Sequence, residues 1–334
     1  MLKKLIYASA AATIMLASCE PKKEEIKVET PSYQKADESA ARAELDKALD
    51  DVDKVVNDNS ELSGARTSAA DLPCGVVEAK KQQDGSYKIN YGVKTPCGVK
   101  KISGYIKIEL IKGKTFAEAG AILKATFVDY LVEYQASKAT IKFNGVKYIT
   151  NLTGSSLKDI LTKDSIVHKV RAYNLQLTFN NGTGSDTTKT WTVARKQTWD
   201  FDGAVDFKNL YGKVEGDTSF TINGKSYSNV TEFGDNKEGQ LFVNEVSTPF
   251  KWSNCGTDWT GPYVLKTGVA THSSSKAAMI NGYKINIDYT FTVKAGYKLN
   301  GITPVFDGSC SSAGYLLQAN VPALNYNVEN YQPY

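Results

Sequence analysis

Asn-Gly and Asp-Gly dipeptides recur through most of the chain, and short alternating segments separate them. Asn-Gly stands at residues 144, 181, 223, 281 and 300, and Asp-Gly at residues 84, 202 and 307. Both dipeptides accept the positive φ angles of tight turns, which makes them the strongest short-range signal of a β-hairpin. Apolar and polar side chains alternate between them, as in residues 87–91 and 285–291. The pattern predicts an all-β fold built as an antiparallel meander of sandwich-like sheets.

This β-rich region divides near residue 190, after the polar segment NNGTGSDTTK. We therefore expect two β-lobes, residues 72–190 and 191–334, which either form separate sheets or share one long sheet. Residues 113–127 are the one stretch that a helix could also fit, and we interpret them as a turn that leads into a strand.

A helical pattern precedes the β-rich region, in residues 36–58. Its apolar side chains recur at spacings of four and three, which places them on one face of a helix. They are Ala41, Leu45, Ala48, Val52 and Val55. This narrow stripe predicts an amphipathic helix that docks on the β-rich body; pairing with a second copy and a semi-rigid stalk are the alternatives. The rest of the tether, residues 19–71, is polar and lacks periodicity.

The first residues of the chain have the pattern of an export signal. Two lysines precede about a dozen mostly apolar residues, a run typical of a secretory signal peptide and shorter than the about 20 residues that span a membrane. The motif LASC at 16–19 resembles the lipobox of bacterial lipoproteins. We expect residues 1–18 to be a signal peptide and Cys19 to carry acyl chains such as palmitate; an ordinary signal peptide that ends near a cysteine is the alternative.

Two or more acyl chains attach a protein stably to a membrane, whereas one chain does so only marginally. We therefore expect the membrane to be a partner through the N-terminal lipid. The expected location is the outer membrane, on its cell-surface or its periplasmic face.

Four further cysteines follow the lipobox: Cys74, Cys97, Cys255 and Cys310. An even number in an exported protein indicates two disulfides, for which three connectivities exist. We favour pairing between sequence neighbours, Cys74 with Cys97 and Cys255 with Cys310, and free buried thiols are the alternative. Zinc is disfavoured because the spacing is wrong and no histidine lies near either pair.

Residues 72–110, LPCGVVEAKKQQDGSYKINYGVKTPCGVKKISGYIKIEL, carry a recognisable order of features. A cysteine, a hairpin, an aromatic residue followed by glycine, a second cysteine, Ser-Gly and a long alternating strand succeed one another. This order resembles a group of uncharacterised β-rich lipoproteins of Bacteroidota, and residues 281–317 resemble the C-terminal pattern of the same group. The resemblance implies a lipid-anchored, β-rich protein, and it implies no activity.

Catalytic motifs are absent from the sequence. It has only two histidines, His168 in an alternating segment and His272 in an expected surface loop, and it lacks a G-x-S-x-G motif, metal-ligand clusters and phosphate-binding loops. We expect no cofactor, no metal and no enzymatic activity. The alternative is a carbohydrate-active hydrolase that uses the carboxylate pair Asp200 and Asp202.

Binding has more support from the sequence. Trp252 and Trp259 flank Cys255, and Asp258 and Tyr263 lie close by. Exposed aromatic rings on a rigid loop are suited to stacking on sugar rings, so we predict these four residues as ligand contacts; Trp191 and Trp199 are expected in the core.

The sequence thus predicts a non-enzymatic binding or structural protein of the cell envelope, with a glycan or another envelope protein as partner. The alternative is a subunit or accessory of a fimbrial-type surface assembly. The net charge of +4, without a block of Lys or Arg, argues against nucleic acid.

Overall fold

The structure is a computed structural model of the chain, and it describes residues 32–58, 72–182, 186–236, 239–258, 262–280, 283–312 and 314–333. The predicted signal peptide, Cys19 and Trp259 lie outside these ranges. No helix within them is long and apolar enough to cross a membrane.

The described ranges contain one α-helix, seventeen strands and three short 3-10 helices. In chain order they are α1 Ser32–Asp58, β1 Glu78–Lys81, β2 Tyr87–Asn90, β3 Thr95–Cys97, β4 Lys100–Lys112, β5 Ala121–Tyr134, β6 Thr140–Asn151, η1 Leu157–Thr162, β7 Ile166–Asn180, β8 Thr187–Phe201, η2 Phe207–Asn209, β9 Leu210–Gly216, β10 Thr218–Ile222, β11 Lys225–Asp235, β12 Leu241–Asn254, β13 Tyr263–Ile280, β14 Tyr283–Asn300, β15 Thr303–Phe306, β16 Gly314–Val321, η3 Pro322–Leu324 and β17 Tyr326–Pro333.

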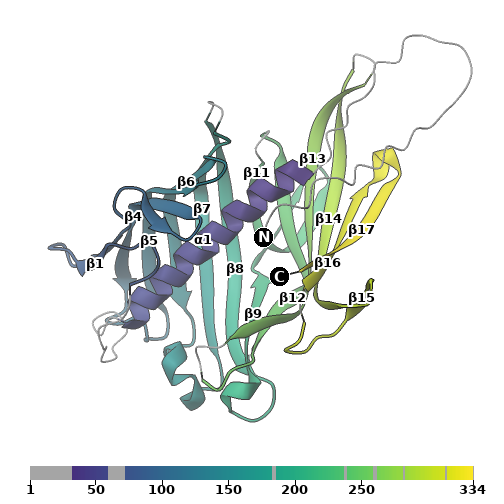
Figure 1. Cartoon of the computed structure of the whole chain (residues 1–334). Coiled ribbons are helices and arrows are strands. Elements are labelled where there is room, and N and C mark those ends of the chain that lie inside the picture. Colours follow the sequence, from purple (N-terminus) through teal and green to yellow (C-terminus); the bar gives the residue numbers. More distant parts are fainter. Residues whose placement is uncertain are drawn as a thin grey trace, which may run out of the picture. The chain divides into compact units, whose positions relative to one another are not determined.

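The strands pair antiparallel, which confirms the all-β prediction. Pairing follows chain order from β4 to β8. At β8 the sheet continues through two strands that share one position, because β9 and β11 both pair with β8 and both pair with β12. From β12 it passes through β13, β14 and β16 to β17. The expected division near residue 190 falls inside β8, and the strands on both sides of it share one long sheet (Figure 1).

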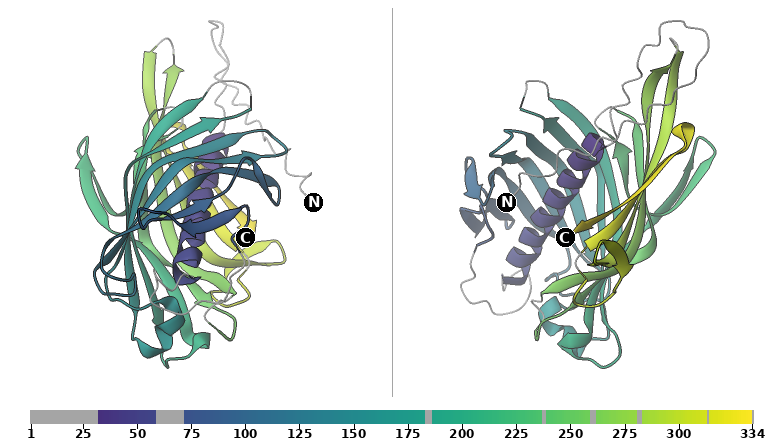
Figure 2. Two further views of the ribbon diagram at one scale, coloured as in Figure 1. Left: turned by 90° about the vertical axis from the view of Figure 1, so that its left-hand side faces the viewer. Right: turned by 45° about the vertical axis from the view of Figure 1, so that its right-hand side comes forward.

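The sheet curves, and α1 lies diagonally across its inner face (Figures 1 and 2). The predicted apolar stripe of the helix is buried and belongs to the largest hydrophobic cluster, which also contains side chains of β2 and β4 to β8. Ala41, Leu45, Ala48 and Val52 are fully buried in it. The helix therefore docks on the sheet, as the stripe predicts.

Asn144-Gly145 is the exception among the turn dipeptides. It lies inside β6 at a shift of register with β7, whereas Asn223-Gly224 forms the tight turn between β10 and β11. Gly145 has φ 131°, and a Cβ atom there would lie 3.1 Å from Leu175 Cδ1. A glycine at this point allows the close approach of β7 and forms a bulge instead of a turn. Asn281-Gly282 lies outside the described residues.

Both predicted disulfides are present. Cys74 pairs with Cys97, with 5.5 Å between their Cα atoms, and Cys255 pairs with Cys310 at 5.9 Å. The first connects the segment before β1 to the end of β3. The second connects the end of β12 to the segment between β15 and β16, close to the strands that form the site described next.

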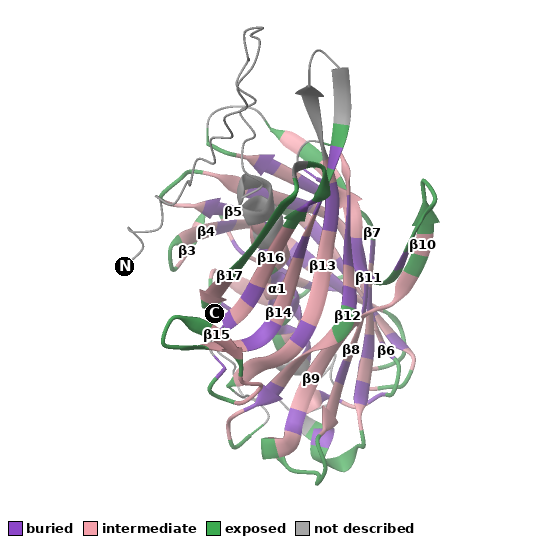
Figure 3. Ribbon diagram, turned by 90° about the vertical axis from the view of Figure 1, so that its right-hand side faces the viewer, coloured by how far each residue is buried: buried purple, intermediate pink, exposed green. Residues whose placement is uncertain are grey.

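The strands β10 and β17 are more exposed than the strands beneath α1. Most side chains of β10 and β17 are exposed to solvent (Figure 3). A small separate cluster of buried residues, Ile287, Tyr289, Phe291 and Val321, holds β14 and β16 together.

Candidate functional site

One flank of α1 is closed by direct contacts with the first strands of the sheet. Tyr134 donates a hydrogen bond to Glu44 Oε1 over 3.0 Å, and Lys100 forms an ion pair with the same carboxylate. Tyr91 donates to Asp51 Oδ2 over 2.7 Å. Both buried carboxylates on this flank therefore have partners, as burial of a charged group requires.

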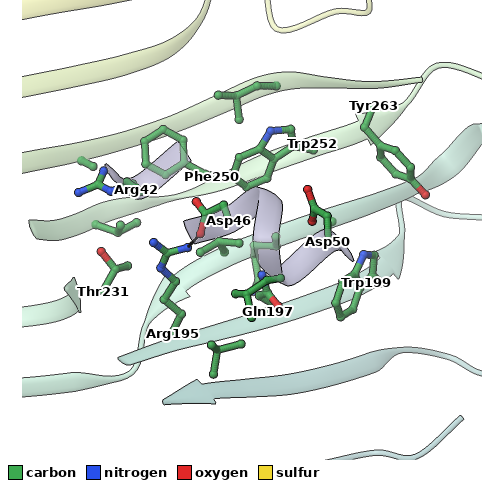
Figure 4. Close-up of a pocket in the computed structure, with 18 of the residues that line it drawn as sticks. Arg42, Asp46, Asp50, Arg195, Gln197, Trp199, Thr231, Phe250, Trp252 and Tyr263 are labelled. Atoms are coloured by element: carbon green, nitrogen blue, oxygen red, sulfur yellow. Dashed lines mark hydrogen bonds and ion pairs between the residues drawn. The ribbon is translucent and has the colours of Figure 1, made fainter. Parts of the chain in front are cut away.

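A cavity of about 610 Å³ lies along the opposite flank, between α1 and strands β8, β9, β12 and β13. Small-molecule sites commonly have volumes of about 300–1,000 Å³. Aromatic side chains of the sheet form much of its wall, and helix carboxylates form the other side (Figure 4). We call this space the aromatic cavity; its aromatic residues are Trp199, Phe250, Trp252 and Tyr263.

Strand register explains the space between the rings. Gly212 of β9 pairs with Trp199 of β8 on one side and with Trp252 of β12 on the other. Paired residues of antiparallel strands project on the same face of a sheet, so the two tryptophans stand on either side of a position that has no side chain. With strands about 4.8 Å apart, the backbones of the two tryptophans are separated by about 10 Å. A Cβ atom at residue 212 would lie 3.5 Å from Trp199 Nε1, so the indole of Trp199 lies over Gly212, and this indole and Trp252 both border the aromatic cavity.

One end of the aromatic cavity is closed by paired charges. Arg195 donates to Asp46 Oδ1 over 2.6 Å and forms an ion pair with the fully buried Glu232. Arg42 Nε donates to Glu232 Oε2 over 2.7 Å, and Asn244 Nδ2 donates to the same oxygen over 3.2 Å. Figure 4 shows Arg42, Asp46 and Arg195 together at this end. These residues hold α1 against β8, β11 and β12.

The other end contains two carboxylates that form no ion pair within the described part of the chain. Asp50 and Asp53 follow Asp46 on the same flank of α1, and both line the aromatic cavity. Burial is the main reason that the pKa of Asp50 rises to about 6; the charges of Asp46 and Asp51 add to the rise, and the charge of Lys47 opposes it. Burial, with the charge of Asp50, raises the pKa of Asp53 to about 7. Asp50 is nevertheless exposed at the open side of the cavity, and Asp53 is half-buried.

Two of the four predicted ligand contacts line the aromatic cavity, and they are Trp252 and Tyr263. Burial and the nearby charge of Asp258 raise the pKa of Tyr263 to about 12, so its phenol stays protonated and can donate a hydrogen bond. Asp258 itself is exposed in the segment after β12 and does not line the cavity.

The two tryptophans expected in the core differ. Trp191 is 1% exposed and donates from Nε1 to the carbonyl of Asp235 over 3.1 Å, so it is a core residue. Trp199 is partly buried; it packs against the small cluster of Ile160, Ile166 and Leu210 and also lines the aromatic cavity.

The carboxylate pair Asp200 and Asp202 lies away from this site. Successive residues of a strand point to opposite faces, so Asp200 and Trp199 project in opposite directions. Asp200 accepts a hydrogen bond from the backbone N–H of Phe201 over 2.7 Å, and Asp202, in the turn after β8, forms an ion pair with Lys251. Neither carboxylate lines the aromatic cavity.

The histidines occupy strands. His168 packs between the rings of Phe116 and Trp199, and burial lowers its pKa to about 4, so it is neutral at physiological pH. His272 was expected in a surface loop, and that expectation is wrong. It lies within β13, where Nδ1 is 2.9 Å from Asn244 Oδ1. The polar run THSSSK has the composition of a loop, but pairing with β12 and β14 holds it as a strand.

Within the described part of the chain, no group of three or more His, Cys, Asp or Glu residues is arranged to hold a metal ion. No protein-family model matches the chain, and neither the curated proteins nor the solved structures include a match to it.

Proposed function

We propose that this chain is a lipid-anchored protein of the bacterial cell envelope that binds a carbohydrate, without catalysis, in the aromatic cavity. The observation that carries the proposal is the pair of tryptophans, Trp199 and Trp252, on either side of Gly212. Sugar rings have apolar faces that stack on aromatic side chains, and their hydroxyl groups need polar partners at the edges.

The edges of the aromatic cavity supply such partners. Gln197 lines it with an amide group, and Tyr263 lines it with a phenol. Carboxylates of α1 add further acceptors for hydroxyl protons. This mixture of ring faces and hydrogen-bonding groups favours a sugar over a purely apolar ligand.

The anchoring part of the proposal rests on the lipobox resemblance of residues 16–19 and on the resemblance to Bacteroidota lipoproteins. Lipid on Cys19 would keep the cavity at a membrane surface, on the outer membrane. The Cys19→Ala variant should lose lipidation and leave the membrane fraction; a variant that stays with the membrane would overturn the anchoring proposal.

A glycan panel tests the binding proposal. The experiment uses the full chain, because residues of α1 form one wall of the cavity and part of the main core. We expect binding to a sugar that Trp252→Ala weakens at least about tenfold, or about 1.4 kcal/mol.

Gly212→Val is the second variant of this test. A Cβ atom at residue 212 would lie 3.5 Å from Trp199 Nε1, an ordinary contact distance. The methyl groups of the valine should therefore crowd the Trp199 ring and narrow the cavity beside it, which should abolish binding while the protein stays folded. Tyr173→Ala, which removes a 63% exposed ring outside the cavity, is the control and should bind normally. Absence of binding to the whole panel, or normal binding by Gly212→Val, contradicts the proposal.

A further inference from the structure

We propose that the carbohydrate bound in the aromatic cavity is an amino sugar with a free, protonated amino group, which the carboxylates of Asp50 and Asp53 receive. The inference rests on the proposed function and names its ligand class. It follows from the charges that line the cavity and from their position beside the aromatic rings.

Every cation that lines the aromatic cavity already has a carboxylate partner. Arg42 pairs with Glu232, and Arg195 pairs with Asp46 and with Glu232. Lys213 pairs with Glu215, with Nζ 3.1 Å from Oε2. These cations are therefore engaged, and an anionic ligand would have to displace an existing ion pair to reach them.

The carboxylates are not balanced in the same way. Asp50 and Asp53 line the cavity, and among the described residues no Lys or Arg lies within ion-pair distance of either one. Lys47, one turn before Asp51, pairs with that residue at 3.3 Å instead. The site thus lacks one cation, and a ligand that carries a positive charge would supply it.

The position of these carboxylates relative to the rings points to an amine on a ring-shaped ligand. Figure 4 shows Asp50 on α1 among Trp199, Trp252 and Tyr263. An ammonium group attached to a sugar stacked on a tryptophan of the cavity wall could reach Asp50, while the ring faces add cation–π attraction. Asp53 follows Asp50 after one helical turn and is close enough to share the same charge.

The energetics favour this ligand over the other classes of glycan. Partial removal from water raises the pKa of both carboxyl groups, although Asp50 is exposed at the open side of the cavity. An acidic sugar would bring a further negative charge beside these carboxylates, and a neutral or N-acetylated sugar would leave them without an ion pair. A ligand with a free amine both occupies the cavity and pairs with their negative charge.

Isothermal titration of the full chain with two matched oligosaccharides tests the inference. The probes are a tetramer of glucosamine and the same tetramer with every amine acetylated. We expect the free-amine form to bind at least about tenfold more tightly. Asp50→Asn and Asp53→Asn, which keep the side-chain shape, should each remove most of this preference. Asp129→Asn, at a side chain 71% exposed outside the cavity, should leave it unchanged.

The outcomes separate the inference from the function beneath it. Equal binding of both tetramers, or tighter binding of the acetylated one, overturns the amine inference and leaves carbohydrate binding intact. Spermidine that competes as strongly as the free-amine tetramer would show that the site binds a positive charge whether or not a sugar carries it. This outcome would overturn the inference as well. If neither tetramer nor any member of the glycan panel binds, the proposed function fails too.

Discussion

The two flanks of α1 face the same sheet and have opposite character. Toward β2, β4 and β5, the space is filled, and Glu44 and Asp51 have partners in Lys100, Tyr134 and Tyr91. Toward β8, β9, β12 and β13, a cavity of about 610 Å³ remains, and Asp50 and Asp53 form no ion pair with any residue that the structure describes. A single helix therefore closes the core on one side and forms the wall of a site on the other.

The strands beneath each flank explain the difference. On the filled side the inner face carries large side chains such as Tyr91, Tyr130 and Phe127, whose rings contact one another at centroid distances of 5.0 Å and 6.0 Å. On the cavity side the corresponding position of β9 is Gly212. Close packing stabilises a protein, whereas empty space beside unpaired charge costs stability. We therefore expect the cavity side to contribute less to stability than the filled side, and the proposed binding site lies on the cavity side.

The largest expected effect contrasts two leucines of α1. Leu45 is fully buried and does not line the aromatic cavity, whereas Leu49, 6% exposed, does line it. Leu45→Ala should lower the free energy of unfolding by about 2–5 kcal/mol, because it opens a new hole in a packed core. Leu49→Ala should cost clearly less, since its neighbours already border empty space. Urea unfolding of both variants measures the difference, and equal losses would contradict the contrast between the flanks.

The next effect concerns Lys147, on the inner face of β6. It is fully buried, its Nζ has no hydrogen-bond partner, and burial lowers its pKa to about 7. The nearby charge of Asp46 opposes this shift and that of Arg195 adds to it. Lys147→Met should raise the free energy of unfolding by an amount on the order of a few kcal/mol, because the buried charge is removed.

The pH dependence gives this prediction a sign. Between pH about 7 and 10.5 the unfolded chain holds a proton on Lys147 that the folded protein has lost, so wild-type stability rises with pH in that window. The gain from Lys147→Met should be largest below pH 7 and shrink as pH rises. Thermal unfolding at pH 6 and pH 9 measures it, and a gain independent of pH would contradict the buried charge.

A smaller loss is expected from Tyr91→Phe on the filled flank. The change removes the 2.7 Å hydrogen bond to Asp51 and leaves that buried carboxylate with Lys47 alone. Loss of a partner for a buried charged group costs about 1–3 kcal/mol. Chemical unfolding at pH 7 measures this cost. An unchanged stability would mean that the carboxylates on the filled flank do not depend on their partners.

The last effect is expected at Asp53, where the pH dependence of stability has the opposite sign to that at Lys147. Its pKa is about 7 in the folded protein against 3.8 for an ordinary aspartate, so the folded state holds the proton more tightly. Stability therefore falls as pH rises from about 4 to 7. The charge that acts on Asp53 is that of Asp50, one turn earlier on the helix.

Asp53→Asn removes this penalty. The variant should have a higher Tm than the wild type at pH 8, and the difference should disappear near pH 4. A variant less stable than the wild type at pH 8 would mean that Asp53 is satisfied as fully as Asp51, and the contrast between the two flanks would then fail.

Much of the fold could be predicted because its signals are local. Turn dipeptides and alternation predict strands, the spacing of Ala41 to Val55 predicts a helix with one apolar face, and the cysteine order predicts both disulfides. The wrong predictions also came from local signals, and each of these signals is compatible with two structures. Asn144-Gly145 fits a bulge as well as a turn, and the polar segment around His272 fits a paired strand as well as a loop.

The candidate site could be predicted only in part. Trp252 and Tyr263 were found because aromatic residues beside a cysteine are conspicuous. Three cavity residues were missed: Trp199, Phe250 and Gly212. Nothing in the sequence distinguishes a tryptophan in the core from a tryptophan that lines a cavity. Asp46, Asp50 and Asp53 recur at spacings of four and three, which places them on one flank of the helix. Their role depends on which part of the sheet that flank contacts.

The sequence by itself determined the class of fold and the helix with its apolar face, and it favoured the cysteine pairing that the structure shows, because each depends on residues that are near in the chain or few in number. Only the tertiary structure decided that the strands form one curved sheet and that α1 crosses its inner face. It alone decided that Gly212 separates Trp199 from Trp252 opposite Asp50. Register between strands and the docking of a helix come from packing among residues that are distant in the sequence. The aromatic cavity exists only because this strand register and this docking of α1 occur together.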